Sequence, residues 1–161
     1  MQTIIPAIPL ADPLDDTAPH DDAIDHHNAL LALYDRTVDS VKGYAKMVEK
    51  AEPSFRDTAE KFRALHARHA EDLTRLLADV GVQAVGDGTI MGTVNQAVVS
   101  FRAFFDNIDE DVMDQIRSGE DWVVKAFDAA ITEQESPNAI VKLRGLQTEL
   151  TDLLAETRHL G

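Results

Sequence analysis

Apolar residues recur along most of the chain at alternating spacings of three and four, the pattern of a helix packed on one face. In a first segment, from about Asp22 to Ala51, the repeating positions are Leu30, Tyr34, Thr37, Val41, Tyr44 and Val48. Pro53 ends this segment and suits the first turn of a second helix, which extends to about Val80 before Gly81. Its repeating positions are Phe55, Ala59, Phe62, His66, His69, Leu73, Leu76 and Val80. The first half of the chain therefore predicts a helical hairpin.

The second half of the chain predicts another hairpin. Its first helix is capped by Asp109, reaches about Gln134 and carries Met113, Ile116, Glu120, Val123, Phe127 and Ala130 on one face. Ser136 and Pro137 suit the cap and first turn of the last helix, which reaches about His159. The face of that helix is Ile140, Leu143, Gln147, Leu150, Leu154 and Thr157. Gly119 costs the third helix about 1 kcal/mol relative to alanine, which predicts a close helix contact there.

A long connection from Gly81 to Ile108 joins the two hairpins. Three glycines in residues 81–89 predict a loop, and residues 90–107 predict a short amphipathic helix. No segment shows the alternation of a β-strand. Four long helices with one long crossover predict an all-α, ferritin-like four-helix bundle over residues 21–161. Residues 1–20 carry four prolines and predict an extended, disordered arm.

Composition excludes several classes of function. The net charge of −14 repels nucleic-acid phosphates and anionic membrane surfaces. The chain has no cysteine, which excludes disulfides, thiolate metal sites and cysteine nucleophiles. No apolar run approaches the ~20 residues of a membrane span, and the N-terminus lacks the basic region of a secretory signal. These features predict a cytoplasmic protein.

Four segments carry a resemblance to a known family. They are VDSVKGYAKMVEKAEP (38–53), FRALHARHAEDLTRLLADVG (62–81), GDGTIMGTVNQ (86–96) and IRSGEDWVVKAFDAAI (116–131). Over residues 25–160 the chain resembles a bacterial family of ferritin-like four-helix proteins classed as a domain of unknown function. The best marks are Asp39, Gly43 and Tyr44, and the run Gly119, Glu120 and Asp121. The resemblance implies a helical bundle and a stress-related role, and it brings no established reaction.

The chain departs from the family at several polar positions. Family members often carry Glu at the place of Val41, Glu-Arg at the place of Arg68-His69, and His near Leu154. If those residues form a polar or metal-binding layer elsewhere in the family, this chain has lost much of that layer. Glu120 remains.

The candidate metal ligands are His66, His69 and Glu120, which all lie near the middle of the predicted bundle. A ferritin-like di-metal centre needs six inward ligands, including a Glu-x-x-His pair from each of two helices. The one such pair, Glu156 and His159, lies on a polar stripe with Glu149 and Asp152, which indicates a solvated face. Two readings of the three candidates stay open: a hydrogen-bonded layer in which Glu120 pairs with an imidazole, or one weakly held Zn²⁺ or Fe²⁺. Thr37 and Gln147 are expected at a similar depth.

Three functional hypotheses follow. The first is a non-catalytic bundle that acts through protein contacts, with self-association foremost and residues 101–105 and the arm as surfaces. The second is a protein that binds one divalent ion through His66, His69 and Glu120. The third is an iron oxidase or peroxide-handling enzyme, which requires a ligand set that the sequence lacks.

Overall fold

The computed structural model describes residues 27–84 and 112–160. These residues form four long helices: α2 (Asn28–Lys50), α3 (Pro53–Asp79), α5 (Met113–Glu133) and α6 (Pro137–Glu156). A 3-10 turn, η2 (Thr157–His159), continues α6. The described part of the chain contains no strand. The all-α four-helix bundle predicted from the sequence is confirmed.

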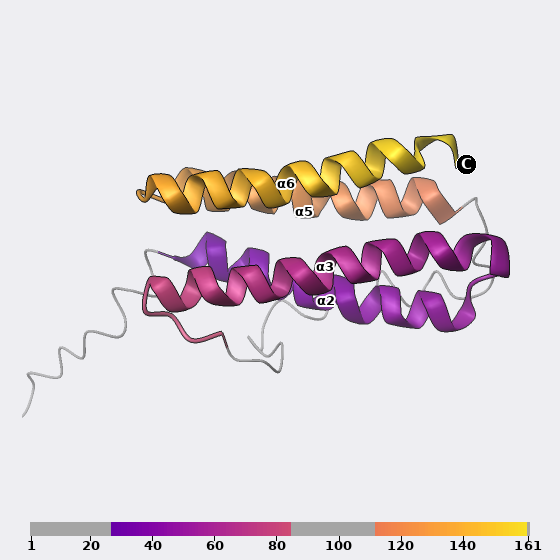
Figure 1. Ribbon diagram of the computed structural model, residues 1–161, viewed down its shortest axis with the longest axis horizontal. Coiled ribbons are helices and arrows are strands. Elements are labelled where there is room, and N and C mark those ends of the chain that lie inside the picture. Colours follow the sequence, from indigo (N-terminus) through magenta and orange to yellow (C-terminus); the bar gives the residue numbers. More distant parts are fainter. Residues whose placement is uncertain (1–26, 85–111, 161) are drawn as a thin grey trace, which may run out of the picture.

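The four helices are arranged as two antiparallel hairpins that lie side by side (Figure 1). α2 and α3 form one hairpin, and α5 and α6 form the other. α5 packs against α2, and α6 packs against α3. α3 and α5 run in the same direction, so residues 84 and 112 lie at opposite ends of the bundle (Figure 1). The predicted crossover helix at residues 90–107, the Asp109 cap and the N-terminal arm all lie outside the described residues.

Local signals in the sequence explain where the helices begin and end. Pro53 occupies the first turn of α3, and the Ser136 side chain accepts a hydrogen bond from the Ala139 amide at the start of α6. Gly81 ends α3 with a φ of +79°, a conformation that glycine adopts without strain. The first turn of α2 is capped from the other hairpin, because Glu133 Oε2 accepts from the amides of Ala29 (3.0 Å) and Leu30 (3.2 Å).

The core lies between the two hairpins and agrees best with the sequence on α5. All six positions predicted for the inner face of that helix are buried. On α2, Val41 and Val48 are only half-buried, and Leu33, Ser40 and Met47 are buried as well. α2 contacts both α3 and α5, and this second contact turns its buried face toward α5.

The predicted faces of α3 and α6 need similar corrections. Leu76 of α3 and Val80, the residue that follows the helix, are half-buried, whereas Leu65 and Leu77 are buried. On α6 the half-buried positions are Ile140, Gln147 and Leu154, and the additional buried ones are Ala139 and Leu146. Apolar spacings of three and four are compatible with the predicted and with the observed buried positions, since both groups of residues lie within one wide apolar stripe of the helix.

Candidate functional site

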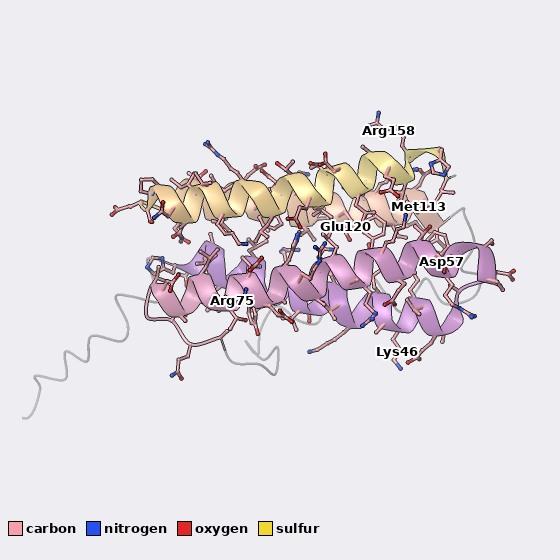
Figure 2. The ribbon with its side chains drawn as sticks, viewed as in Figure 1. Lys46, Asp57, Arg75, Met113, Glu120 and Arg158 are labelled. Atoms are coloured by element: carbon pink, nitrogen blue, oxygen red, sulfur yellow. The ribbon has the colours of Figure 1, made fainter. Side chains whose placement is uncertain are left out.

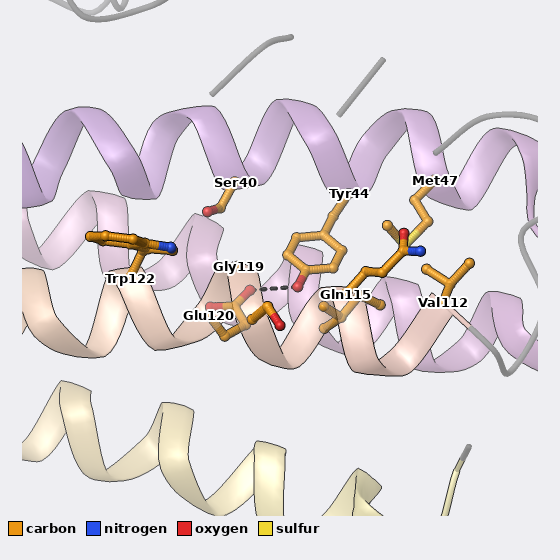
Figure 3. A pocket seen from close by; sticks show the side chains of 10 residues that line it. Ser40, Tyr44, Met47, Val112, Gln115, Gly119, Glu120 and Trp122 are labelled. Carbon is orange, nitrogen blue, oxygen red and sulfur yellow. Dashed lines mark hydrogen bonds between the residues drawn. The ribbon is translucent and has the colours of Figure 1, made fainter. Parts of the chain in front are cut away.

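A hydrogen-bonded cluster of polar side chains lies in the core between the hairpins. Glu120 of α5 is 2% exposed and points toward α2 and α3 (Figure 2). Its Oε1 accepts a hydrogen bond from the Tyr44 hydroxyl at 2.5 Å (Figure 3) and also lies 3.0 Å from Nε2 of His66. A carboxylate oxygen is an acceptor, so the imidazole donates to it through Nε2. Three helices thus converge on one oxygen atom.

The protonated form of Tyr44 suits this cluster. Burial raises the pKa of the Tyr44 hydroxyl well above its ordinary value, and the charge of Glu120 raises it further. The phenol therefore keeps its proton and remains a donor to the carboxylate.

His69 makes a second carboxylate contact, one turn of α3 away from His66. Its side chain is buried, and its Nε2 lies 3.2 Å from Oε2 of Glu149, whose side chain is half-exposed. Arg68 lies 3.8 Å from the same carboxylate oxygen. Burial lowers the pKa of His69 below its ordinary value, and the hydrogen bond to Glu149 opposes this shift in part.

Aromatic and imidazole rings connect the two contacts into a continuous stack. Tyr44 lies parallel to Phe62 at 5.2 Å between ring centroids and to His66 at 5.6 Å. His66 and His69 meet edge to face at 6.2 Å, and His69 meets Phe127 in the same way at 5.9 Å. These separations are typical of favourable ring pairs and hold the imidazoles in fixed orientations.

The sequence-based view of this layer was right in part. His66, His69 and Glu120 are buried as expected, and Glu120 pairs with an imidazole. Thr37 and Gln147 do not join the layer. Thr37 donates to the Leu33 carbonyl of its own helix at 2.8 Å, and Gln147 donates to the Val124 carbonyl and to Asp128 of α5.

Two members of the layer were missed from the sequence. Tyr44 was assigned to the apolar face of its helix. A buried tyrosine hydroxyl usually has a hydrogen-bond acceptor, and this rule could have indicated that Tyr44 belongs to the polar layer. Glu149 was assigned to a solvated stripe with Glu156 and His159. Those two residues are exposed, but Glu149 reaches His69.

A di-metal centre does not fit this arrangement. Across residues 27–84 and 112–160, no three His, Asp or Glu side chains come together in a way that could hold a metal ion. Within this cluster, three buried polar atoms nevertheless have no hydrogen-bond partner among the described residues: Nδ1 of His66, Nδ1 of His69 and Oε2 of Glu120. The arrangement keeps the protons of Tyr44 and of the imidazoles in fixed positions. It also leaves these three atoms able to form a hydrogen bond or coordinate bond to a bound ligand.

A cavity of about 330 Å³ lies next to the cluster, between α2 and α5. Tyr44, Ser40 and Glu120 line it together with Met47, Val112, Ile116, Gln115, Ser118, Gly119 and Trp122 (Figure 3). The prediction of a close helix contact at Gly119 is wrong, because a Cβ atom built there meets nothing within 4 Å. Gly119 instead leaves room for the cavity.

The opposite interface, between α3 and α6, is bridged by charged pairs. Lys61 binds Glu156 at 2.5 Å, and Lys142 binds Asp72 at 2.8 Å. The α2–α5 interface differs in chemistry, since its cavity is lined mainly by neutral side chains. The α3–α6 side of the bundle is therefore charged, whereas the α2–α5 side is mainly neutral.

The family model described as Domain of unknown function (DUF2383) matches residues 25–133 of the chain. The chain belongs to this family. The match includes α2, α3 and α5, and with them Tyr44, His66, His69 and Glu120. It ends at residue 133, short of the resemblance expected to residue 160, so α6 and Glu149 lie beyond it. No curated protein and no solved structure matches the chain.

Acid is expected to weaken the fold through His69. Its folded pKa lies below the ordinary value of 6.5, so the stability that comes from burying the neutral ring is complete above pH 6.5. That stability is lost as the pH falls below 6.5, because the unfolded chain binds the proton first. Urea unfolding at pH 7.5 and 5.5 should show the decline, and His69→Leu should flatten it. The control is His159→Gln, which removes an exposed imidazole; an equal slope in His69→Leu and the unmodified chain would contradict the prediction.

Proposed function

We propose that the chain is a non-catalytic, ferritin-like bundle that acts in the cytoplasm through protein contacts, first of all with a second copy of itself. Its buried acid and imidazoles are engaged with one another and with Tyr44 and Glu149. Such a layer is suited to defining how the helices pack. The family resemblance adds a stress-related setting to this proposal.

The exposure of Trp122 carries the proposal. This residue is the single tryptophan of the chain and is 60% exposed on α5. Tryptophan is among the residues most enriched at the energetic centres of protein interfaces.

The distribution of charge favours association of two copies through the surface around Trp122. A chain of net charge −14 repels its own copies over most of its surface. Gln115, Ser118 and Gly119 line the cavity together with Trp122 and are uncharged, and the charged neighbours Asp121 and Lys125 pair with each other at 3.5 Å. A pairing of two such patches across a two-fold axis brings together few like charges.

Sedimentation velocity over a range of concentrations tests self-association. We expect the full chain to dimerise and Trp122→Ala to weaken the dimer about tenfold or more, because a central aromatic anchor is lost. Val141→Ala is the matched control, since Val141 is 70% exposed on α6 and does not line the cavity beside Trp122. A chain that begins at Asp21 shows whether residues 1–20 contribute. A monomer at every concentration would overturn the proposal.

A second candidate function, the holding of one divalent ion, is favoured by the unpaired imidazole nitrogens. His66 and His69 each direct Nε2 to a carboxylate and leave Nδ1 without a partner. Metal-bound histidines commonly have such a carboxylate on the other ring nitrogen. Two imidazoles and the free oxygen of Glu120 would supply three ligands at most, the number that suits a single Zn²⁺ or Fe²⁺, but the described residues do not bring these three groups together around one point, so an ion would have to draw them closer.

Metal analysis of the untagged protein, repeated on His66→Leu and His69→Leu, tests this candidate. We expect either no metal or one weakly held ion that both substitutions remove, and no oxidation of Fe²⁺ by oxygen. Two tightly bound irons per chain, or iron oxidation that disappears in His66→Leu, would show that the chain is an oxidase instead.

A further inference from the structure

The cavity between α2 and α5 has the proportions of a small-molecule site. Its volume of about 330 Å³ is at the lower end of the range typical of ligand pockets. Met47, Val112, Ile116 and Trp122 give it apolar walls. Ligand pockets are commonly apolar cavities with a few polar groups that orient the ligand.

One polar group of this cavity is incompletely satisfied. Glu120 lines the cavity and is 2% exposed, and its Oε1 already receives Tyr44 and His66. Its second oxygen, Oε2, is buried and has no partner among the described residues. A buried carboxylate oxygen without a donor is costly, so a donor that enters the cavity gains from binding there.

We propose that this cavity binds a small organic cation, in which a primary ammonium group donates to Oε2 of Glu120 and an apolar body lies between the apolar walls. The charges around the cavity favour this class of ligand. None of the described lining residues is Lys, Arg or His, and Glu120 is the one lining residue that carries a charge. The net charge of −14 also attracts cations and repels anions.

The aromatic residues that line the cavity, Tyr44 and Trp122, suit the same ligand. The Lys125 ammonium lies 4.9 Å from the centre of the Trp122 ring, so this indole already accepts a cation over its face. Phenol and indole rings on the two sides of Glu120 give an ammonium group a favourable electrostatic surrounding (Figure 3).

This inference goes beyond the proposed function, because it rests on Glu120 inside the cavity, whereas self-association rests on the exposed part of Trp122. Each can therefore fail alone. Sedimentation of the same variants separates them: Glu120→Gln is expected to leave the dimer intact. Gln115, Ser118 and Gly119 belong both to the cavity lining and to the proposed dimer surface, so ligand and second copy are expected to compete.

Titration of the full chain with three matched probes tests the site. The probes are phenethylamine, which is charged at pH 7, the neutral phenethyl alcohol, and the anion phenylacetate. Fluorescence of Trp122, the chain's single tryptophan, reports occupancy at the rim, and calorimetry measures affinity. We expect the amine to bind at least about tenfold more tightly than the alcohol, and phenylacetate not to saturate.

Two variants locate the binding. Glu120→Gln keeps the shape of the side chain and is expected to remove the preference for the amine. Asp121→Asn is the matched control, since it removes the same charge from the neighbouring exposed position. Gly119→Leu fills the cavity without changing Glu120 and is expected to abolish binding of both the amine and the alcohol, with folding checked by circular dichroism.

Three results would overturn the inference. The first is the absence of saturable amine binding to the unmodified chain. The second is equal affinity for the amine and the alcohol. The third is an equal loss of amine binding in Glu120→Gln and Asp121→Asn, which would reduce the effect to overall charge.

Discussion

Replacing Glu120 by alanine is expected to lower the free energy of unfolding by about 3 kcal/mol. Two buried donors, the Tyr44 hydroxyl and Nε2 of His66, lose their shared acceptor. Each unpaired buried donor costs about 1–3 kcal/mol, and water that enters from the adjacent cavity recovers part of this cost. Urea unfolding at pH 7.5 measures the loss.

Glu156→Ala is the control for this measurement. Glu156 pairs with Lys61 between the hairpins, but both side chains are more than half exposed. Such surface pairs contribute about 0–1 kcal/mol. Equal losses in the two variants would mean that Glu120 faces water and that the cluster does not exist.

Tyr44→Phe resolves the cluster further. It removes one donor and leaves Glu120 paired with His66, so a loss smaller than that of Glu120→Ala is expected. The double variant should lose less than the sum of the two single losses, because both remove the same hydrogen bond.

The inner face of α5 was predictable because its polar and apolar positions leave little choice. The single buried acid, Glu120, falls in register with the apolar residues on both sides of it, and all six positions are buried. α2 was harder to orient, because Ser40 is small and polar yet buried at a contact, whereas Val41 is apolar yet half-buried. Residue hydropathy alone would predict that Val41 is more buried than Ser40, whereas the opposite is observed.

The partners of the buried polar groups depend on distances that the sequence does not contain. Tyr44 and Glu120 are 76 positions apart, and His69 and Glu149 are 80 apart. A half-exposed carboxylate such as Glu149 has the sequence pattern of a solvated residue, since only the approach of α6 to α3 brings it to the imidazole. The burial of the candidate site and the pairing of Glu120 with an imidazole could therefore be predicted, but the contacts of Tyr44 and Glu149 could not.

Phe127 of α5 packs against His69 and connects the buried polar cluster to the apolar core. Phe127 is completely buried, and its ring meets the imidazole edge to face at 5.9 Å. It is the end of the ring stack that begins at Phe62, so it joins the two hairpins through α3 and α5. Its ring therefore contributes both burial and a ring contact to the cluster.

Replacing Phe127 by alanine is therefore expected to cost about 4 kcal/mol, the usual loss when a buried phenylalanine leaves a cavity. Trp122→Ala on the same helix is the control: its side chain is largely exposed, and at protein concentrations at which the chain is monomeric its loss should remain below about 1 kcal/mol. Phe127→Ala should also weaken the pH dependence below 6.5, because water in the new cavity relieves the burial that lowers the pKa of His69. Both measurements come from the same urea series at pH 7.5 and 5.5. A cost no larger than that of Trp122→Ala would place Phe127 outside the core, and an unchanged pH slope would show that its ring does not shield the imidazole.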